Sequence, residues 1–340
     1  MKKFLLSVLL LPLTIGVLGA CSSGGASSSK EGGKEDLTTV RIGYMPNFSS
    51  VALAVIAKDA GYFEEQGIKP ELVEFADGPT IISAMESGSI NVGNIGPGAH
   101  VLLPQGKAEV AMMDQLGNAD AVLGSKKKGV NSLEDLKGKK IAVATGTSSE
   151  TILKLTLKKA GLTDKDVELM DMDASAITTA MLSGKIDACA TWSPNTHTIK
   201  KDMGDDLVEL STNADFTEEL PSVTSWAIKP GYYKENKDLM VRFEKAMMKA
   251  MDYRKDDGSE MAKWVAKQLA VDESSVEQQL NDGQYFSSKE MNKMASDGEL
   301  LKLYSTQQEN FVNTGMLDKK ADMLEPKDYV HTDLIEEATK

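Results

Sequence analysis

The chain alternates short apolar runs with longer segments whose apolar residues recur at helical spacing, starting from Thr39. Short runs rich in Val, Ile and Ala predict buried strands, and the longer segments predict helices. The predicted strands are residues 40–44, 71–75, 90–95, 140–144, 167–170 and 188–192, and the predicted helices are residues 51–65, 79–87, 148–160, 174–183, 239–251, 261–269 and 300–312. Strands and helices that alternate in this way form βαβ units, so the sequence predicts an α/β fold with parallel-rich sheets.

Two stretches of the chain repeat each other at a constant offset of 96 residues. Residues 84–91 (AMESGSIN) and 180–187 (AMLSGKID) share Ala, Met, Ser, Gly and Ile. A Ser-Gly junction between a helix and a strand is common, so chance is the alternative to a duplicated βαβ plan. A duplication predicts two similar lobes that face each other. Ligands of open α/β sheets bind beyond the carboxyl ends of the strands, so the predicted site lies between the lobes.

Three loops follow predicted strands and lead into helices: residues 45–50, 96–100 and 145–150. Each loop offers backbone N–H groups and hydroxyls at a helix amino terminus, which is a common way to hold an anionic group. Ordinary N-capping explains any one of these loops equally well. Together they give the candidate ligand-binding residues Asn47, Phe48, Ser49, Gly96, Pro97, Gly98, Gly146, Thr147, Ser148, Ser149 and Glu150.

The amino-terminal segment predicts export. Two lysines precede an apolar run over residues 4–18, which is too short for a membrane span of about 20 residues and typical of a signal peptide over residues 1–20. The sequence LGAC, ending at Cys21, resembles the lipobox of bacterial lipoproteins, in which the cysteine is lipidated. The alternative is an ordinary cleavage site with a chance cysteine. Residues 21–38 are rich in Gly, Ser, Lys and Glu and predict a flexible tether, which places the protein outside the cytoplasmic membrane.

Charge and composition exclude several classes of function. The chain has 340 residues and a formal net charge of −13, which disfavours nucleic acid and anionic lipid as partners. A small anion is not disfavoured, because local N–H groups in a cleft can bind it. Two cysteines are too few for a disulfide scaffold or a cysteine-built zinc site, and we expect no metal and no cofactor. Cys189 is expected to be a small buried residue, and His100 either touches ligand or starts a helix at the surface.

Enzyme motifs are also missing from the sequence. No GxSxG, P-loop, HExxH or CxxC motif occurs, and the three histidines are scattered. We therefore expect no catalytic residues, although an enzyme built on the same fold remains the less favoured alternative.

Several short motifs resemble one known family. They are GY at residues 43–44, GYF at 61–63, GSINVG at 88–93, LGNADAV at 116–122, LEDLKGKKIAV at 133–143 and ATWSP at 190–194. Their order and spacing resemble the extracytoplasmic substrate-binding proteins of ABC importers, in the group that binds taurine, aliphatic sulfonates, nitrate and pyrimidine precursors of thiamine. The taurine branch is the most similar. The resemblance covers about residues 39–320, nearly all of the mature chain.

The resemblance implies a two-lobed fold of the periplasmic-binding-protein type (type II) with a ligand cleft between the lobes. We expect residues 39–118 plus 226–340 to form one lobe and residues 119–225 the other. A protein of this family is expected to be a monomer that closes over its ligand and delivers it to an ABC permease and its ATPase. The only expected membrane contact is a lipid anchor on Cys21.

Taurine carries a sulfonate and an ammonium group, so the expected site has two ends. The sulfonate is expected on the N–H groups of the turns at residues 96–98 and 146–149. The ammonium group needs an acid and an aromatic face, for which the candidates are Asp120, then Glu150, with Trp192 for a cation–π contact. Asp120 is equally compatible with a solvated hinge residue, and Trp226 either lines the cleft or fills the core.

The sequence does not settle the ligand. Asn47, Phe48 and Asn195 match no single taurine binder, so a thiamine pyrimidine precursor, nitrate, or another organic acid or amine are alternatives.

Overall fold

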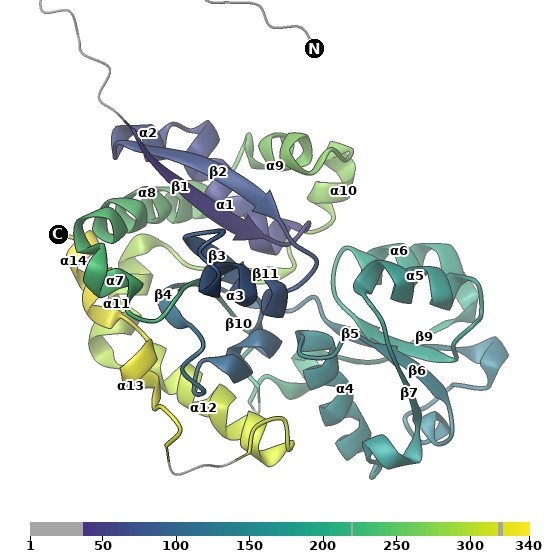
Figure 1. Cartoon of the computed structure of the whole chain (residues 1–340). Helices are drawn as coiled ribbons and strands as arrows, with labels where there is room; N and C mark the ends of the chain where they lie inside the picture. Colours follow the sequence, from purple (N-terminus) through teal and green to yellow (C-terminus); the bar gives the residue numbers. More distant parts are fainter. Residues whose placement is uncertain (1–36, 219, 319–321) are drawn as a thin grey trace, which may run out of the picture. The chain divides into compact units, whose positions relative to one another are not determined.

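The computed structural model describes residues 37–218, 220–318 and 322–340. The predicted signal peptide, Cys21 and the tether up to residue 36 lie outside these residues. The described chain contains two mixed sheets, each with helices packed against it (Figure 1). The helices are α1 (Phe48–Asp59), α2 (Tyr62–Glu65), α3 (Gly78–Glu86), α4 (Ser148–Lys159), α5 (Ala174–Leu182), α6 (Asn195–Met203), α7 (Tyr232–Glu235), α8 (Lys237–Asp256), α9 (Met261–Leu269), α10 (Glu273–Glu277), α11 (Ser288–Asp297), α12 (Glu299–Asn313), α13 (Pro326–Tyr329) and α14 (Thr332–Ala338).

The first sheet has six strands in the order β11-β4-β10-β3-β1-β2. These are β1 (Thr38–Tyr44), β2 (Ile68–Glu74), β3 (Val92–Ile95), β4 (Glu109–Gly117), β10 (Val223–Ile228) and β11 (Gly283–Tyr285). Strand β1 pairs in parallel with β2 and β3, whereas β10 is antiparallel to both β3 and β4. We call this sheet, with the helices that pack on it, the first lobe.

The second sheet has five strands in the order β7-β6-β8-β5-β9. These are β5 (Ala121–Ser125), β6 (Lys140–Val143), β7 (Glu168–Asp171), β8 (Ala188–Thr191) and β9 (Leu207–Thr212). Strand β6 is parallel to β7 and β8, and β5 is antiparallel to β8 and β9. This sheet and its helices α4, α5 and α6 form the second lobe. Cys189 is fully buried in β8, as expected, and burial raises the pKa of its thiol to about 12.

The two lobes share one plan. The order β2-β1-β3 in the first sheet matches β7-β6-β8 in the second, with the same parallel pairing. The repeated sequence stretches occupy equivalent places, at the end of α3 before β3 and at the end of α5 before β8. The predicted pair of similar α/β units is therefore confirmed. The alternation of strands and helices did not predict antiparallel strands. Two of them, β5 and β10, come directly after a crossing of the chain from one sheet to the other, and β11 is antiparallel to β4 without following such a crossing.

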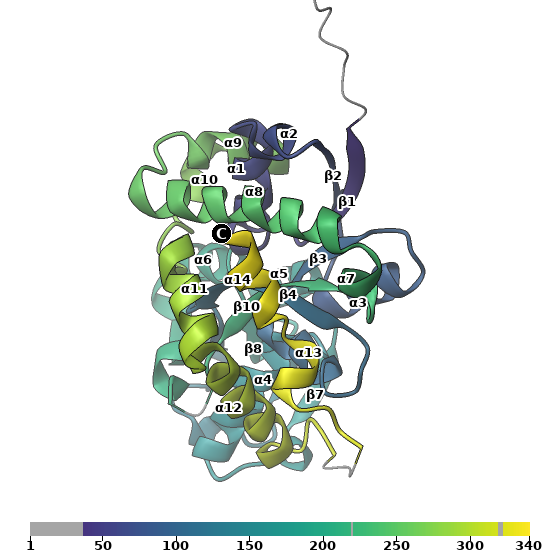
Figure 2. The same ribbon diagram turned by 90° about the vertical axis from the view of Figure 1, so that its left-hand side faces the viewer.

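Residues 118–120 connect β4 to β5, and residues 213–222 connect β9 to β10, so the chain crosses between the lobes twice. The carboxyl-terminal part of the chain then covers the first sheet with helices. Figure 2 shows α8, α11, α12, α13 and α14 on the side that faces the viewer, in front of β4 and β10. Their buried residues, such as Phe243, Met247 and Tyr304, join one continuous apolar core with β1 and α1. These helices make the first lobe the larger of the two.

Candidate functional site

A cavity lies between the lobes, at the carboxyl ends of β1, β3, β6 and β8. Its volume is about 70 Å³, measured as the space open to the centres of water molecules, which suits a small molecule. Eight of the residues predicted from the sequence line it: Asn47, Ser49, Gly96, Pro97, Asp120, Thr147, Ser148 and Trp192. These residues come from three separate loops, the chain crossing and the segment directly after β8, and the fold brings them together.

Two long helices begin at the cavity. The side chain of Asn47 caps α1 by accepting a hydrogen bond from the N–H of Ser50 at 2.9 Å. Thr147 caps α4 by accepting from the N–H of Ser149 at 3.3 Å. The capping interpretation of these loops is therefore correct. The amino termini of both capped helices are nevertheless directed at the cavity, because Ser49 and Ser148 in their first turns line it.

Six of the predicted residues lie outside the cavity lining. Phe48 is fully buried against Tyr285, and Ser149 is buried and accepts from the N–H of Ala144 at 3.1 Å. Glu150 accepts from the N–H of Gly146 at 2.8 Å and pairs with Lys154 at 3.1 Å. These three side chains are engaged in local structure.

Trp226 and His100 belong to the interior. Trp226 is fully buried in β10, so it fills the core of the first lobe. Both expectations for His100 are wrong, because its ring is buried and its Nδ1 lies 2.6 Å from Gln307 Oε1, so it is neither at the surface nor at the cavity. Burial lowers the pKa of His100 to about 4.

Gly98 forms a contact between the lobes. It lies in the 3₁₀ helix η1 (Pro97–Leu102) of the first lobe, and a Cβ atom built there would stand 2.0 Å from the backbone carbonyl carbon of Thr147 in the second. The two turns expected to bind an anion side by side therefore pack against each other. Only a residue without a side chain allows this approach, which explains the glycine at position 98.

Asp120 is buried at the first crossing of the chain, with 6% of its surface exposed. One carboxylate oxygen accepts from Ser148 Oγ at 2.5 Å, and the other accepts from Asn213 Nδ2 at 3.0 Å. Burial raises the pKa of Asp120, these two hydrogen bonds oppose the rise, and the charge of Asp282 adds to it. The expectation of a solvated hinge residue is wrong on solvation, because the carboxylate is enclosed at the cavity wall.

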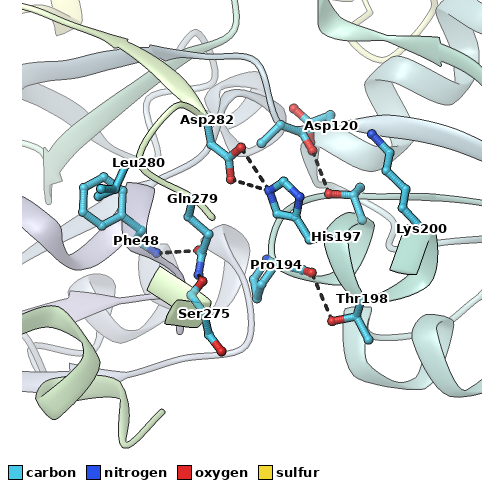
Figure 3. A network of polar contacts seen from close by, with 12 residues as sticks. Phe48, Asp120, Pro194, His197, Thr198, Lys200, Ser275, Gln279, Leu280 and Asp282 are labelled. Atoms are coloured by element: carbon cyan, nitrogen blue, oxygen red, sulfur yellow. Dashed lines mark hydrogen bonds and ion pairs between the residues drawn. The ribbon is translucent and has the colours of Figure 1, made fainter. Parts of the chain in front are cut away.

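A second carboxylate, Asp282, also lines the cavity and was missed in the sequence. It lies before β11, and both of its oxygens are 3.2 Å from Nε2 of His197 on α6 (Figure 3). This contact joins the first lobe to the second beside the cavity. No pattern in the sequence could have found it, because 85 residues separate the two side chains.

Other missed lining residues are polar side chains within or beside buried strands. Asn94 in β3 and Gln115 in β4 are fully buried, and Ser193, Ser222 and Thr224 line the same space. The signal that could have revealed them is an uncharged polar residue inside an apolar strand, such as Asn94 in VGNI. Such a residue needs either a hydrogen-bonding partner or a ligand.

The charge of the cavity is negative. Two carboxylates line it, and among the described residues that line it there is no lysine, arginine or histidine. A purely anionic ligand would meet these two carboxylates. Asp282 has His197 in contact with it at 3.2 Å, outside the cavity lining. The hydrogen bonds to Asp120, by contrast, come from the neutral side chains of Ser148 and Asn213. The arrangement is therefore suited to a ligand that carries a positive group as well as oxygen acceptors.

Within the described part of the chain, no group of three or more His, Cys, Asp or Glu side chains is placed to hold a metal ion. Among the same residues, no helix combines the length and apolar character needed to span a membrane.

Comparison with known proteins gives consistent results. The family model described as NMT1/THI5 like matches residues 32–260. A protein of Brucella abortus (strain 2308), provisionally named a binding protein, is 33% identical to this chain over 298 residues. The aligned region covers 88% of this chain and 92% of that one. A Bacillus subtilis (strain 168) protein with the provisional name of aliphatic sulfonates-binding protein is 28% identical over 348 aligned positions, covering 99% of this chain and 97% of that one.

Solved structures show the same fold. The periplasmic aliphatic sulphonate binding protein SsuA from Escherichia coli superimposes with a TM-score of 0.67 at 19% identity, covering 88% of this chain and 99% of that one. The expected periplasmic-binding-protein architecture is therefore confirmed.

Proposed function

This chain belongs to the NMT1/THI5 like family, and from that premise we propose that it is the extracytoplasmic binding protein of an ABC importer, with a small sulfonate such as taurine as its ligand. The Bacillus subtilis relative, with its name of aliphatic sulfonates-binding protein, supports the sulfonate class. In this proposal the protein binds and releases its ligand, performs no chemistry on it, and passes it to a permease. The segments at residues 118–120 and 213–222 act as the hinge between the lobes.

The observation that carries this proposal is the pairing of two helix amino termini with two carboxylates around one cavity. The starts of α1 and α4 offer the N–H groups of Ser49 and Ser148 to a sulfonate, together with the hydroxyl of Ser49. The hydroxyl of Ser148 is already donated to Asp120. Asp120 and Asp282 offer negative charge to an ammonium group, and the indole of Trp192 offers an aromatic face. A small amino sulfonate has both ends that this cavity can satisfy.

Calorimetric titration of the chain from residue 37 onward tests the proposal. The panel comprises taurine, methanesulfonate, nitrate, a thiamine pyrimidine precursor and simple amino acids. We expect taurine to bind and to remain unchanged after prolonged incubation. If no sulfonate binds, the proposed ligand class is wrong. Conversion of any panel member to a product would show an enzyme.

Replacing Asp120 by asparagine is expected to weaken taurine binding by about 10- to 100-fold. The change keeps the shape of the side chain. The remaining oxygen can still accept from Asn213, and the new amide N–H can donate to the hydroxyl of Ser148. What is lost is a charge-assisted hydrogen bond to the ligand, worth about 1.5–3 kcal/mol, where about 1.4 kcal/mol corresponds to a factor of ten. Asp257→Asn makes the same change of charge at an exposed position and is expected to bind normally. Equal binding by Asp120→Asn and the parent protein would exclude Asp120 from the site.

The same variant has a pH signature. Burial raises the pKa of Asp120, so as the pH is lowered Asp120 takes up its proton at a higher pH than an ordinary carboxyl group does. Taurine keeps both of its charges at that pH. The affinity for taurine is therefore expected to fall as Asp120 becomes protonated. Asp120→Asn is expected to lose this pH dependence. The stability of the ligand-free protein depends on pH in the opposite direction from the affinity for taurine. Because the pKa is higher in the folded state, ionisation of Asp120 lowers stability as the pH rises from the unfolded to the folded pKa.

Export and lipidation are part of the proposal and depend on residues 1–21, outside the described residues. We expect labelled palmitate to appear in the full chain expressed in bacteria and not in a Cys21→Ser variant, which should be found in the soluble extracytoplasmic fraction. Equal labelling of both proteins would contradict lipidation at Cys21.

A further inference from the structure

A buried ion pair lies behind the wall of the cavity on the side of the first lobe. Arg254 of α8 contacts the carboxylate of Asp114 in β4, with Nη1 and Oδ1 2.8 Å apart, and neither side chain is exposed. A second guanidinium nitrogen donates to the backbone carbonyl of Asp114 at 3.1 Å. The guanidinium also stacks on the ring of Tyr285 at 4.5 Å. Neither charged group lines the cavity.

This ion pair sets the orientation of two amide side chains that do line the cavity. Asn94 Nδ2 donates to Asp114 Oδ2 at 3.0 Å, and Gln115 Oε1 accepts a longer hydrogen bond from Arg254 Nη1 at 3.5 Å. A carboxylate only accepts and a guanidinium only donates, so each amide has one favourable orientation. The nitrogen and oxygen of a side-chain amide can usually be exchanged by a flip of the group, and here the charged partner selects one of the two orientations.

The free end of each amide is consequently defined. Asn94 Oδ1 is left as an acceptor and Gln115 Nε2 as a donor, and both atoms are buried without a hydrogen-bond partner among the described residues. Ser193 Oγ, on the other side of the cavity, is in the same state. Leaving a buried polar group unpaired is unfavourable, so three such groups around one cavity call for a partner that enters it.

We propose that Asn94 and Gln115 contact the ligand, as acceptor and donor respectively, and that Arg254 and Asp114 act as positioning residues that hold them in this orientation. With Asp120 and Asp282 beside them, the Asn94 acceptor selects a ligand with N–H donors, while Gln115 takes one of its oxygens. The inference rests on the proposed function and narrows it. The ligand class is an amino sulfonate, and donor-free anions such as methanesulfonate and nitrate are rejected.

The test of the contacts uses Gln115→Met, which keeps the length of the side chain and removes the free donor together with the acceptor of the long 3.5 Å hydrogen bond from Arg254. Its taurine affinity is expected to fall about 10- to 100-fold, as for the loss of one hydrogen bond to a charged group. Because Gln115 Nε2 has no partner in the ligand-free protein, the melting temperature without ligand is expected to stay within a few degrees of the parent value. Gln105→Met, at an exposed position, is the matched control.

A second variant, Gln115→Glu, distinguishes the loss of the hydrogen-bond donor at position 115 from the loss of side-chain packing there. Gln115→Glu keeps an oxygen toward Arg254 but turns the free end into an acceptor, so taurine affinity is expected to fall at least as far as in Gln115→Met. Normal taurine binding by both variants would overturn the proposed contact. A large loss of melting temperature in ligand-free Gln115→Met would also overturn it, because the amide would then be serving the fold.

The ligand class is tested on the parent protein by comparing taurine with methanesulfonate. We expect methanesulfonate to bind at least 100-fold more weakly. Equal affinity would overturn the requirement for N–H donors and leave the sulfonate function standing. If neither compound binds, the proposed function fails and the amino-sulfonate class fails with it. The two failures are therefore distinguishable.

Discussion

Replacing Gly98 by alanine is expected to lower ligand affinity by about 100-fold or more while leaving the fold intact. A Cβ atom at this position would lie 2.0 Å from the backbone carbonyl carbon of Thr147, far inside the normal contact distance. The obstacle is backbone, so no side chain can rotate away, and the two lobes must stay apart. If the closed form then falls to about 1% of the population, apparent affinity falls by the same factor.

The alanine should not disturb the first lobe itself. Gly98 does not adopt a positive φ, so the substitution introduces no backbone strain there, and the contact that it blocks is made with the other lobe. Urea unfolding is therefore expected to be close to that of the parent protein.

Gly96→Ala controls for closure, because a Cβ atom there would meet only Met45 Cε, at 3.9 Å, and no backbone of the second lobe. Its affinity is not used as a control, since Gly96 lines the cavity. Binding is measured by calorimetry, and closure by small-angle X-ray scattering without taurine and at saturating taurine. We expect the parent protein and Gly96→Ala to become more compact with ligand and Gly98→Ala to remain open. Parent-like binding and compaction by Gly98→Ala would show that the contact between residues 98 and 147 is not required for closure.

The second large effect concerns stability. Replacing Arg254 by methionine is expected to lower the free energy of unfolding by about 3–5 kcal/mol, because Asp114 would remain as a buried carboxylate without its cation. Burial already raises the pKa of Asp114, and the nearby arginine opposes that rise. Urea titration followed by circular dichroism measures the loss.

The double variant Arg254→Met with Asp114→Leu separates the charge effect from lost packing. Removing both charges leaves no uncompensated ion, so most of the stability lost in Arg254→Met should return. Losses that simply add in the double variant would indicate that packing, and not the unpaired charge, is responsible. Taurine binding is expected to stay weak in the double variant, because Asn94 and Gln115 lose the groups that orient them.

Much of the fold was predictable because its signals are local. The strands β1, β2, β3, β6, β7 and β8 and the helices α1, α3, α4 and α5 follow from the alternation of apolar runs and amphipathic segments, within a few residues at each end. The strands β4 and β5, which lie on either side of the first crossing, were not predicted. The repeat at residues 84–91 and 180–187 predicted two units of the same plan, and the structure shows that plan in the order β2-β1-β3 and β7-β6-β8.

The candidate site was predictable only in part. Loops after strands were correctly expected to meet at the cavity, since the carboxyl ends of parallel strands lie at one edge of a sheet. Within a loop, however, sequence could not say which residue faces the cavity. Ser148 lines it and the next residue, Ser149, is buried below it, because the helix turns its successive side chains in different directions.

The sequence by itself determined the α/β class, the duplicated plan and the three polar loops, since each of these is encoded by residues close together along the chain. Only the tertiary structure decided that Asp282 joins Asp120 at the cavity, that Gly98 meets Thr147, and that Asp114 and Arg254 contact the amides of Asn94 and Gln115. The residues in these contacts lie apart along the chain, since Gly98 and Thr147 are 49 residues apart and Asp120 and Asp282 are 162 residues apart. Their physical cause is the double crossing of the chain and the packing of α8 behind the first sheet, neither of which leaves a local pattern in the sequence.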